Sequence, residues 1–177
     1  MKPFALPGQH EYDGQAFPLG IDVAAESLDE ACAWVTGAAL ELSRLAGEHG
    51  AVLVRGLPLA KPEEFDAVLS AFGYPNFSYA NSLSKAYRIN HSPRVFSANE
   101  APADVTIFLH HEMAQTPFYP SKLIFFCQVA AGQGGATPVC RSDILWERLK
   151  AEQGMFAADC ETKGLRYTNV MPGEADT

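Results

Sequence analysis

The stretch from Ser27 to Gly50 constrains the fold more than any other part of the sequence. Ser27 and Glu30 form a capping-box pattern, which is typical of a helix start, and Gly50 supplies a helix stop. Between them, apolar residues recur at helical spacing, at Ala31, Trp34, Val35, Ala38, Ala39, Leu42 and Leu45. The sequence therefore predicts a long amphipathic helix whose apolar face packs against another element.

The segments on either side of this helix predict two short strands and a second helix. Residues 1–26 are rich in proline and glycine, which indicates an irregular arm with one short strand at 19–23. Residues 51–56 are mostly apolar and predict another strand. A second helix is expected to open at Pro62, because proline suits the first helical turn, and to end near Phe72.

The second half of the chain combines β-prone runs with turns that contain glycine or proline. Strands are expected at 105–110, 122–129, 136–140 and 165–170, and the run 122–129 is apolar enough to be fully buried. Helices are expected at 143–150, with Ser142 as the N-cap, and near 156–162.

This order of elements favours the α+β class. Early helices followed by short strands indicate helices that flank a β-sandwich or barrel, for which a jelly roll is one solution. Residues 74–104 show little periodicity, and loops of this length inside a compact domain usually carry function. No repeat or linker divides the chain, so residues 1–177 are predicted to form a single domain.

The composition excludes several classes of partner. The net charge is −8 and the sequence contains no long basic run, which argues against nucleic acid and against an anionic membrane surface. The apolar run Leu123–Cys127 is too short to span a bilayer. Four dispersed cysteines without a C-x-x-C spacing favour free thiols in a reducing cytoplasm over a secreted disulfide framework.

The run His110-His111-Glu112 is the strongest candidate for chemistry. On a strand, alternate side chains share a face, so His110 and Glu112 are expected to point together and His111 away. An imidazole and a carboxylate on one face are two of the three ligands of a 2-His-1-carboxylate iron site. In a random sequence of this length and composition, the expected number of His-x-Asp/Glu triplets is about 0.5. The triplet alone is therefore a weak signal, and its meaning depends on its context. That context is a β-prone strand before it and the run Gly134-Gly135-Ala136-Thr137 after it.

Together these motifs resemble the taurine dioxygenase and clavaminate synthase-like family. In this family a His-x-Asp/Glu pair is followed by a threonine, and here Thr137 lies 27 residues after His110. The segments 50–56, 97–113 and 120–127 also resemble the family, so the likeness covers most of residues 50–142. The glutamate in place of the commoner aspartate points toward the clavaminate synthase-like and amino-acid hydroxylase branch.

The resemblance implies a fold, a reaction and a set of site residues. The fold is a double-stranded β-helix, a form of jelly roll, and the cofactors are Fe(II) and 2-oxoglutarate. By resemblance His110 and Glu112 bind the iron, and Thr137 donates its hydroxyl to a carboxylate of 2-oxoglutarate. The implied reaction couples oxidative decarboxylation of 2-oxoglutarate to hydroxylation of a C–H bond in a small, amino-acid-like substrate. Candidates for contacts with that substrate are Arg88, Arg94 and Asn99.

The family's distal histidine and its arginine for 2-oxoglutarate have no clear counterpart. No histidine follows His111, and the arginines after Thr137 are Arg141, Arg148 and Arg166. Family chains are also longer, so these residues are expected to be the N-terminal portion of a dioxygenase jelly roll. The alternative is a natural truncation that serves as a non-catalytic binding or interaction module. Half a jelly roll exposes sheet edges and apolar faces, which favours pairing with another chain, such as a second copy.

Two other arrangements would complete a metal site within this sequence. His91, in the long loop, could approach the iron as the third ligand. Alternatively, a cupin-like barrel could bind zinc or iron through His110, His111 and Glu112 without 2-oxoglutarate, provided that the strand ends at His110.

Overall fold

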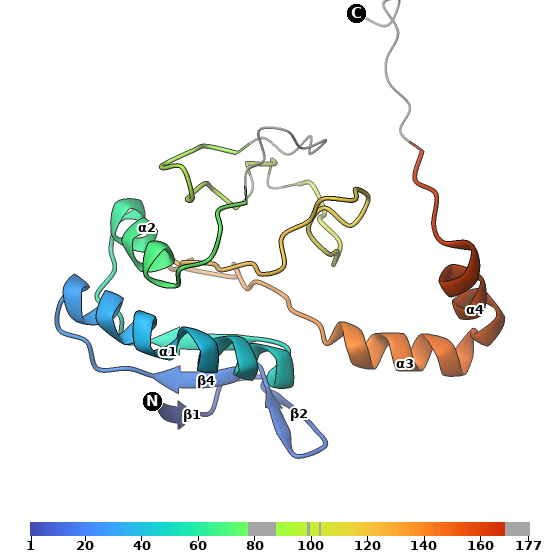
Figure 1. Ribbon diagram of the computed structural model, residues 1–177, viewed down its shortest axis with the longest axis horizontal. Coiled ribbons are helices and arrows are strands. Elements are labelled where there is room, and N and C mark those ends of the chain that lie inside the picture. The colour runs from blue at the N-terminus through green and yellow to red at the C-terminus, as the bar shows by residue number, and fades with distance from the viewer. Residues whose placement is uncertain (78–87, 99, 103, 169–177) are drawn as a thin grey trace, which may run out of the picture. The chain divides into compact units, whose positions relative to one another are not determined.

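The computed structural model describes residues 1–77, 88–98, 100–102 and 104–168 (Figure 1). The chain divides into two compact units, Met1–Cys140 and Arg141–Thr177. Its described residues combine helices with small sheets, which confirms the α+β class. None of the helices in this described part has both the length and the apolarity needed to cross a membrane.

A three-stranded sheet lies at the N-terminal end of the first unit. Its order is β1 (Lys2–Phe4), β4 (Leu19–Asp22) and β5 (Val52–Arg55), with β1 antiparallel and β5 parallel to β4. Parallel neighbours need a long crossover connection, and α1 (Leu28–His49) supplies it. The predicted strands at 19–23 and 51–56 are thereby confirmed. The irregular arm contains a further hairpin, β2 (His10–Tyr12) with β3 (Gln15–Phe17).

Helix α1 begins and ends where the sequence predicts. The Ser27 hydroxyl accepts a hydrogen bond from the Glu30 amide at 3.2 Å, and Gly50 ends the helix with a left-handed φ of 75°. The capping box differs from the standard pattern in one detail. The Glu30 carboxylate accepts a hydrogen bond from the amide of Glu26, at 2.8 Å, in place of the amide of the N-cap residue Ser27.

The core lies where the apolar face of α1 meets the sheet and α2 (Pro62–Ala71) (Figure 1). One buried cluster joins the sheet to the helix and consists of Ile21, Ala38 and Leu42. A second cluster joins the two helices and consists of Ala31, Val35 and Val68. All six residues are apolar, and four of them have branched aliphatic side chains, so burying them removes apolar surface from water. The core thus confirms the helical periodicity of the sequence.

The start of α2 depends on Glu64. Its carboxylate accepts hydrogen bonds from the amides of Ala60 and Lys61, at 2.7 and 3.1 Å. These two bonds lower the pKa of Glu64 below its usual 4.5, because they favour the charged carboxylate.

Replacing Glu64 by alanine is expected to lower the melting temperature at neutral pH. A carboxyl group with a lowered folded-state pKa stabilises the fold above pH 4.5, and this contribution is lost as the pH falls through the folded-state pKa. The difference in melting temperature between wild type and Glu64→Ala should therefore become smaller in acid. Thermal unfolding by circular dichroism, from pH 7 down to pH 3, measures this difference. Glu63→Ala is the control, since it removes a like charge from the same turn and leaves both bonds in place.

The strands predicted for the second half are not found among the described residues. The runs 105–110, 122–129, 136–140 and 165–168, the last being the described part of the strand predicted at 165–170, have no strand partner there, and most of their residues are exposed. A strand persists only when a neighbour satisfies its backbone N–H and C=O groups, so a β-prone sequence is not sufficient. The run 122–129 is not fully buried either, although the ring of Phe126 packs against Phe65 of α2 with centroids 5.2 Å apart.

The second unit contains α3 (Ser142–Glu152) and α4 (Gly154–Lys163), which confirms both predicted helices. Ser142 is the first helical residue and Arg141 takes the N-cap position, so the predicted cap is wrong. The Arg141 guanidinium donates to both carboxylate oxygens of Asp143, at 2.8 and 2.6 Å. This bidentate contact lowers the pKa of Asp143 to about 2.

Candidate metal centre

His110 and Glu112 converge, but on a turn and not on a strand. Irregular backbone leads to His110, and a turn covers residues 112–115. The turn is anchored by Met113, which is 4% exposed and has a left-handed φ of 60°. Its carbonyl accepts a hydrogen bond from the Thr116 amide at 3.0 Å. The result places Nε2 of His110 4.0 Å from Oε2 of Glu112.

The other ring nitrogen of His110 has a backbone partner. Its Nδ1 lies 2.7 Å from the carbonyl oxygen of Phe108. A carbonyl oxygen can only accept, so Nδ1 carries the proton, and in the neutral ring Nε2 then presents its lone pair toward Glu112. Metal-binding histidines usually show this arrangement, in which a backbone carbonyl or a carboxylate fixes the orientation of the ring.

These two side chains fit a divalent transition metal. Imidazole nitrogen and carboxylate oxygen are the donor types of the facial iron site. In a facial site two ligands are about 90° apart at the metal, so two ligand atoms about 2.1 Å from it lie about 3.0 Å from each other. The observed 4.0 Å is longer than this by about 1 Å. The side chain of His110 is 57% exposed and that of Glu112 only 14%, so metal binding would bring the two together mainly by a small movement of the segment that carries His110.

Arg88 contacts the opposite oxygen of the same carboxylate. Its Nη2 lies 3.2 Å from Oε1 of Glu112, and the Arg88 side chain is 15% exposed. The guanidinium also lies over the ring of Phe96, 5.4 Å from its centroid, and donates to the carbonyl of Ala98. The sequence points to Arg88 as a substrate contact, and nothing in the local pattern indicates its pairing with Glu112, which lies 24 residues further on.

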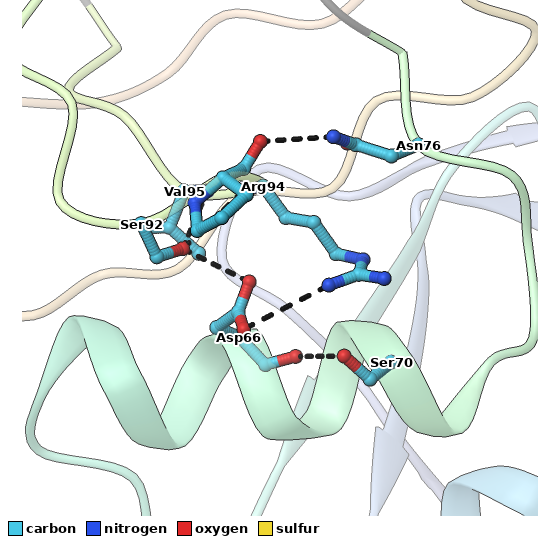
Figure 2. Close-up of polar contacts among 7 residues, drawn as sticks. Asp66, Ser70, Asn76, Ser92, Arg94 and Val95 are labelled. Carbon is cyan, nitrogen blue, oxygen red and sulfur yellow. Dashed lines mark hydrogen bonds and ion pairs between the residues drawn. The ribbon is translucent and has the colours of Figure 1, made fainter.

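Arg94 lies in a polar cluster that joins the loop to α2 (Figure 2). Its Nη1 is 4.0 Å from the carboxylate of Asp66, which also accepts a hydrogen bond from the Ser92 hydroxyl at 2.9 Å. Ser92 in turn accepts from the amides of Arg94 and Val95, and Asn76 donates to the carbonyl of Pro93. This cluster fixes the loop 90–96 on the helix. The third substrate candidate, Asn99, lies outside the described residues.

Thr137 follows the predicted turn. Gly134 and Gly135 have φ values of 68° and 70°, a backbone conformation that favours glycine, and an added Cβ at Gly135 would lie 2.4 Å from that of Ala131. Thr137 itself is exposed. In the described part of the chain it makes no hydrogen bond to His110, Glu112 or Arg88, so the structure brings those three together without it.

A third protein ligand is not found among the described residues, where no three side chains of the types His, Cys, Asp or Glu form a group that could hold a metal ion. All five histidines belong to this described part. His91 therefore does not join His110 and Glu112, and its amide instead bonds the carbonyl of Val95 at 2.9 Å. The cupin-like arrangement with His111 is likewise wrong here, because the turn at Glu112 does not bring His111 into a three-ligand group.

Comparison with known proteins identifies the family. Residues 15–175 match the model of the taurine catabolism dioxygenase TauD, TfdA family. A clavaminate synthase-like protein of Arabidopsis thaliana is 36% identical over 97% of this chain and 53% of its own length. A dapdiamide synthesis protein of Enterobacter agglomerans is 27% identical over 76% of this chain and 40% of its own length. The chain thus spans about half the length of the curated relatives that it matches. It belongs to the TauD/TfdA dioxygenase family.

Proposed function

We propose that the protein is a non-heme iron oxygenase in which His110 and Glu112 bind Fe(II) and 2-oxoglutarate is the cosubstrate. The observation that carries the proposal is the pairing of Nε2 of His110 with Oε2 of Glu112, at 4.0 Å, while the Phe108 carbonyl fixes the ring. Family membership supports the same chemistry.

Each residue has a distinct part in this proposal. When bound, iron with 2-oxoglutarate and dioxygen supplies oxidative decarboxylation of the 2-oxo acid, coupled to hydroxylation of a C–H bond. His110 and Glu112 hold and orient the metal, and Thr137 donates its hydroxyl to a carboxylate of 2-oxoglutarate. The substrate is a small, amino-acid-like molecule, which the loop 88–98 is suited to meet, because its first residue, Arg88, lies 3.2 Å from Glu112.

The proposal includes a single jelly-roll domain, of which residues 1–177 are the N-terminal portion, in a cytoplasmic enzyme. In that fold the runs 105–110, 122–129 and 136–140 are strands that pair with further strands. Several large apolar side chains in them are now in contact with water, among them Phe108 at 80%, Phe125 at 63% and Val129 at 83% exposure. Pairing and burial of these runs would remove that surface from water. The third iron ligand and the arginine for 2-oxoglutarate come from residues outside the described part.

The experiment that tests this function is an assay of succinate release by the full-length protein. With Fe(II), dioxygen and 2-oxoglutarate we expect slow release without substrate and faster release when a suitable amino-acid-like compound is added. A chelator such as EDTA should abolish the release, and excess Fe(II) should restore it. Release that continues unchanged in the chelator would contradict an iron-dependent reaction.

A second candidate function is a binding module without catalysis. Two observations favour it: the exposed apolar side chains of residues 105–129, and the finding that no three potential ligands form a metal-binding group among the described residues. A module of this kind would form a stable complex, such as a homodimer, with the same affinity in the presence and absence of Fe(II). Sedimentation with and without the metal separates the two functions.

Replacing Thr137 by valine is expected to weaken 2-oxoglutarate binding by about 10- to 100-fold, because a hydrogen bond to a charged group contributes roughly 1.5–3 kcal/mol. Fe(II) affinity should stay unchanged, since the hydroxyl contacts the cosubstrate alone. Calorimetric titration under nitrogen measures both affinities. Thr162→Val is the control, because that hydroxyl bonds the Ala158 carbonyl of its own helix. An unchanged affinity for 2-oxoglutarate in Thr137→Val would exclude the assignment.

A further inference from the structure

The ion pair between Arg88 and Glu112 connects the loop 88–98 to the candidate iron ligand. It joins Nη2 of Arg88 to Oε1 of Glu112 at 3.2 Å, and the two side chains are only 15% and 14% exposed. A charge pair in such a partly buried position is screened less by water and salt than a pair on the surface. The contact can therefore fix the orientation of the carboxylate.

The two oxygens of Glu112 have different neighbours. Oε1 contacts the guanidinium, whereas Oε2 lies 4.0 Å from Nε2 of His110. Carboxylates that bind metals are usually held by a hydrogen bond from outside the ligand set, which selects the oxygen that reaches the metal. Here Arg88 holds one oxygen and leaves the other directed toward His110.

Arg88 is itself held in place by its own segment. Ile89 and Ser97 face each other across a short turn, with the Ser97 amide donating to the Ile89 carbonyl at 2.9 Å and the Ile89 amide donating to the Ser97 hydroxyl at 2.9 Å. The guanidinium stacks over Phe96 and donates to the Ala98 carbonyl. A guanidinium is planar and offers several fixed donors, so it can bind carbonyl, ring and carboxylate at once.

We propose that Arg88 is a positioning residue for iron binding, which holds Oε1 of Glu112 so that Oε2 and Nε2 of His110 face one metal ion. This inference rests on the proposed function, because it assumes that the pair binds Fe(II). The inference assigns Arg88 a role in iron binding, whereas the sequence suggested that it contacts the substrate.

Anaerobic titration of the full-length protein with Fe(II) alone tests the inference, with affinity measured by calorimetry in wild type, Arg88→Gln, Arg88→Lys and Arg44→Gln. We expect Arg88→Gln to bind Fe(II) about 10- to 100-fold more weakly, which is the usual effect of losing a hydrogen-bond partner of a ligand. Arg88→Lys keeps the positive charge, and its Fe(II) affinity should lie between that of wild type and that of Arg88→Gln. Arg44→Gln removes a like charge from an exposed pair on α1 and should bind as wild type does.

Two further readouts separate positioning from a general loss of structure. Circular dichroism of the metal-free variants should show the wild-type helix content at the titration temperature. Hydrogen exchange of the metal-free protein should be faster at residues 110–116 in Arg88→Gln and unchanged in α1. Wild-type affinity in Arg88→Gln, or a loss that follows unfolding alone, would overturn the inference. A wild type that binds no Fe(II) would instead overturn the proposed function, and this inference with it.

Discussion

Replacing His110 by alanine is expected to lower the affinity for Fe(II) by about 100-fold or more. The loss of a residue that merely supports a ligand costs about 10- to 100-fold, so the loss of the ligand itself should cost at least as much. The effect is specific to this ring because its Nε2, at 4.0 Å from Oε2 of Glu112, is held there by the Phe108 carbonyl. Equilibrium titration of the full-length protein with Fe(II) under nitrogen measures it.

His111→Ala is the matched control for this prediction. It removes the same type of side chain from the adjacent position, whereas the ring nitrogen that lies 4.0 Å from Oε2 of Glu112 belongs to His110. Its Fe(II) affinity should remain within about twofold of wild type, a difference of less than 0.5 kcal/mol by the relation between affinity and free energy. If both variants lose affinity equally, the assignment of His110 alone is wrong and the cupin-like site with His111 regains support.

Replacing Leu42 by alanine is expected to lower the free energy of unfolding by about 2–5 kcal/mol. Leu42 is 6% exposed and packs with Ile21 and Ala38, where α1 meets the sheet. Its removal leaves a cavity in a core that α1 and a few short strands share. A loss of this size is a large part of the 5–15 kcal/mol by which domains are usually stable.

Leu40→Ala is the control for this core prediction. It makes the same chemical change two residues earlier on α1, at a side chain that is 87% exposed. Its free energy of unfolding should stay within about 0.5 kcal/mol of wild type. Urea unfolding followed by circular dichroism gives both values. Equal destabilisation by the two variants would show that the apolar face of α1 is misassigned.

The first 73 residues were largely predictable because their signals are local. The capping residues Ser27 and Glu30, the stop at Gly50 and the apolar repeat of α1 all lie within one helix, and each acts over a few residues. Proline at the start of α2 is a local signal of the same kind. The parallel pairing of β4 with β5 follows once a long helix connects two short apolar runs.

The second half was less predictable because a strand depends on residues far from it in sequence. The run 122–129 has the composition of a buried strand, yet its backbone finds no partner strand in the described part of the chain. Composition indicates only that a segment can form a strand, whereas pairing decides that it does. The helices α3 and α4 formed as predicted, since a helix satisfies its backbone groups internally.

The candidate site shows the same division between local and distant signals. The convergence of His110 and Glu112 was expected from strand alternation, and a turn anchored by Met113 produces it instead. The contact of Arg88 with Glu112 could not be predicted, because a loop without periodicity gives no register against another segment. The identity of the third iron ligand is beyond local patterns for the same reason.

The most direct test of the iron site is an anaerobic absorption titration of the full-length protein. Fe(II) followed by 2-oxoglutarate should produce a weak visible charge-transfer band in the wild type, with one iron bound per chain, and neither addition alone should produce it. The band should be absent in His110→Ala at the same concentrations. A wild type without the band at saturating Fe(II) and 2-oxoglutarate, or an undiminished band in His110→Ala, would contradict the assignment of His110 and Glu112 as iron ligands.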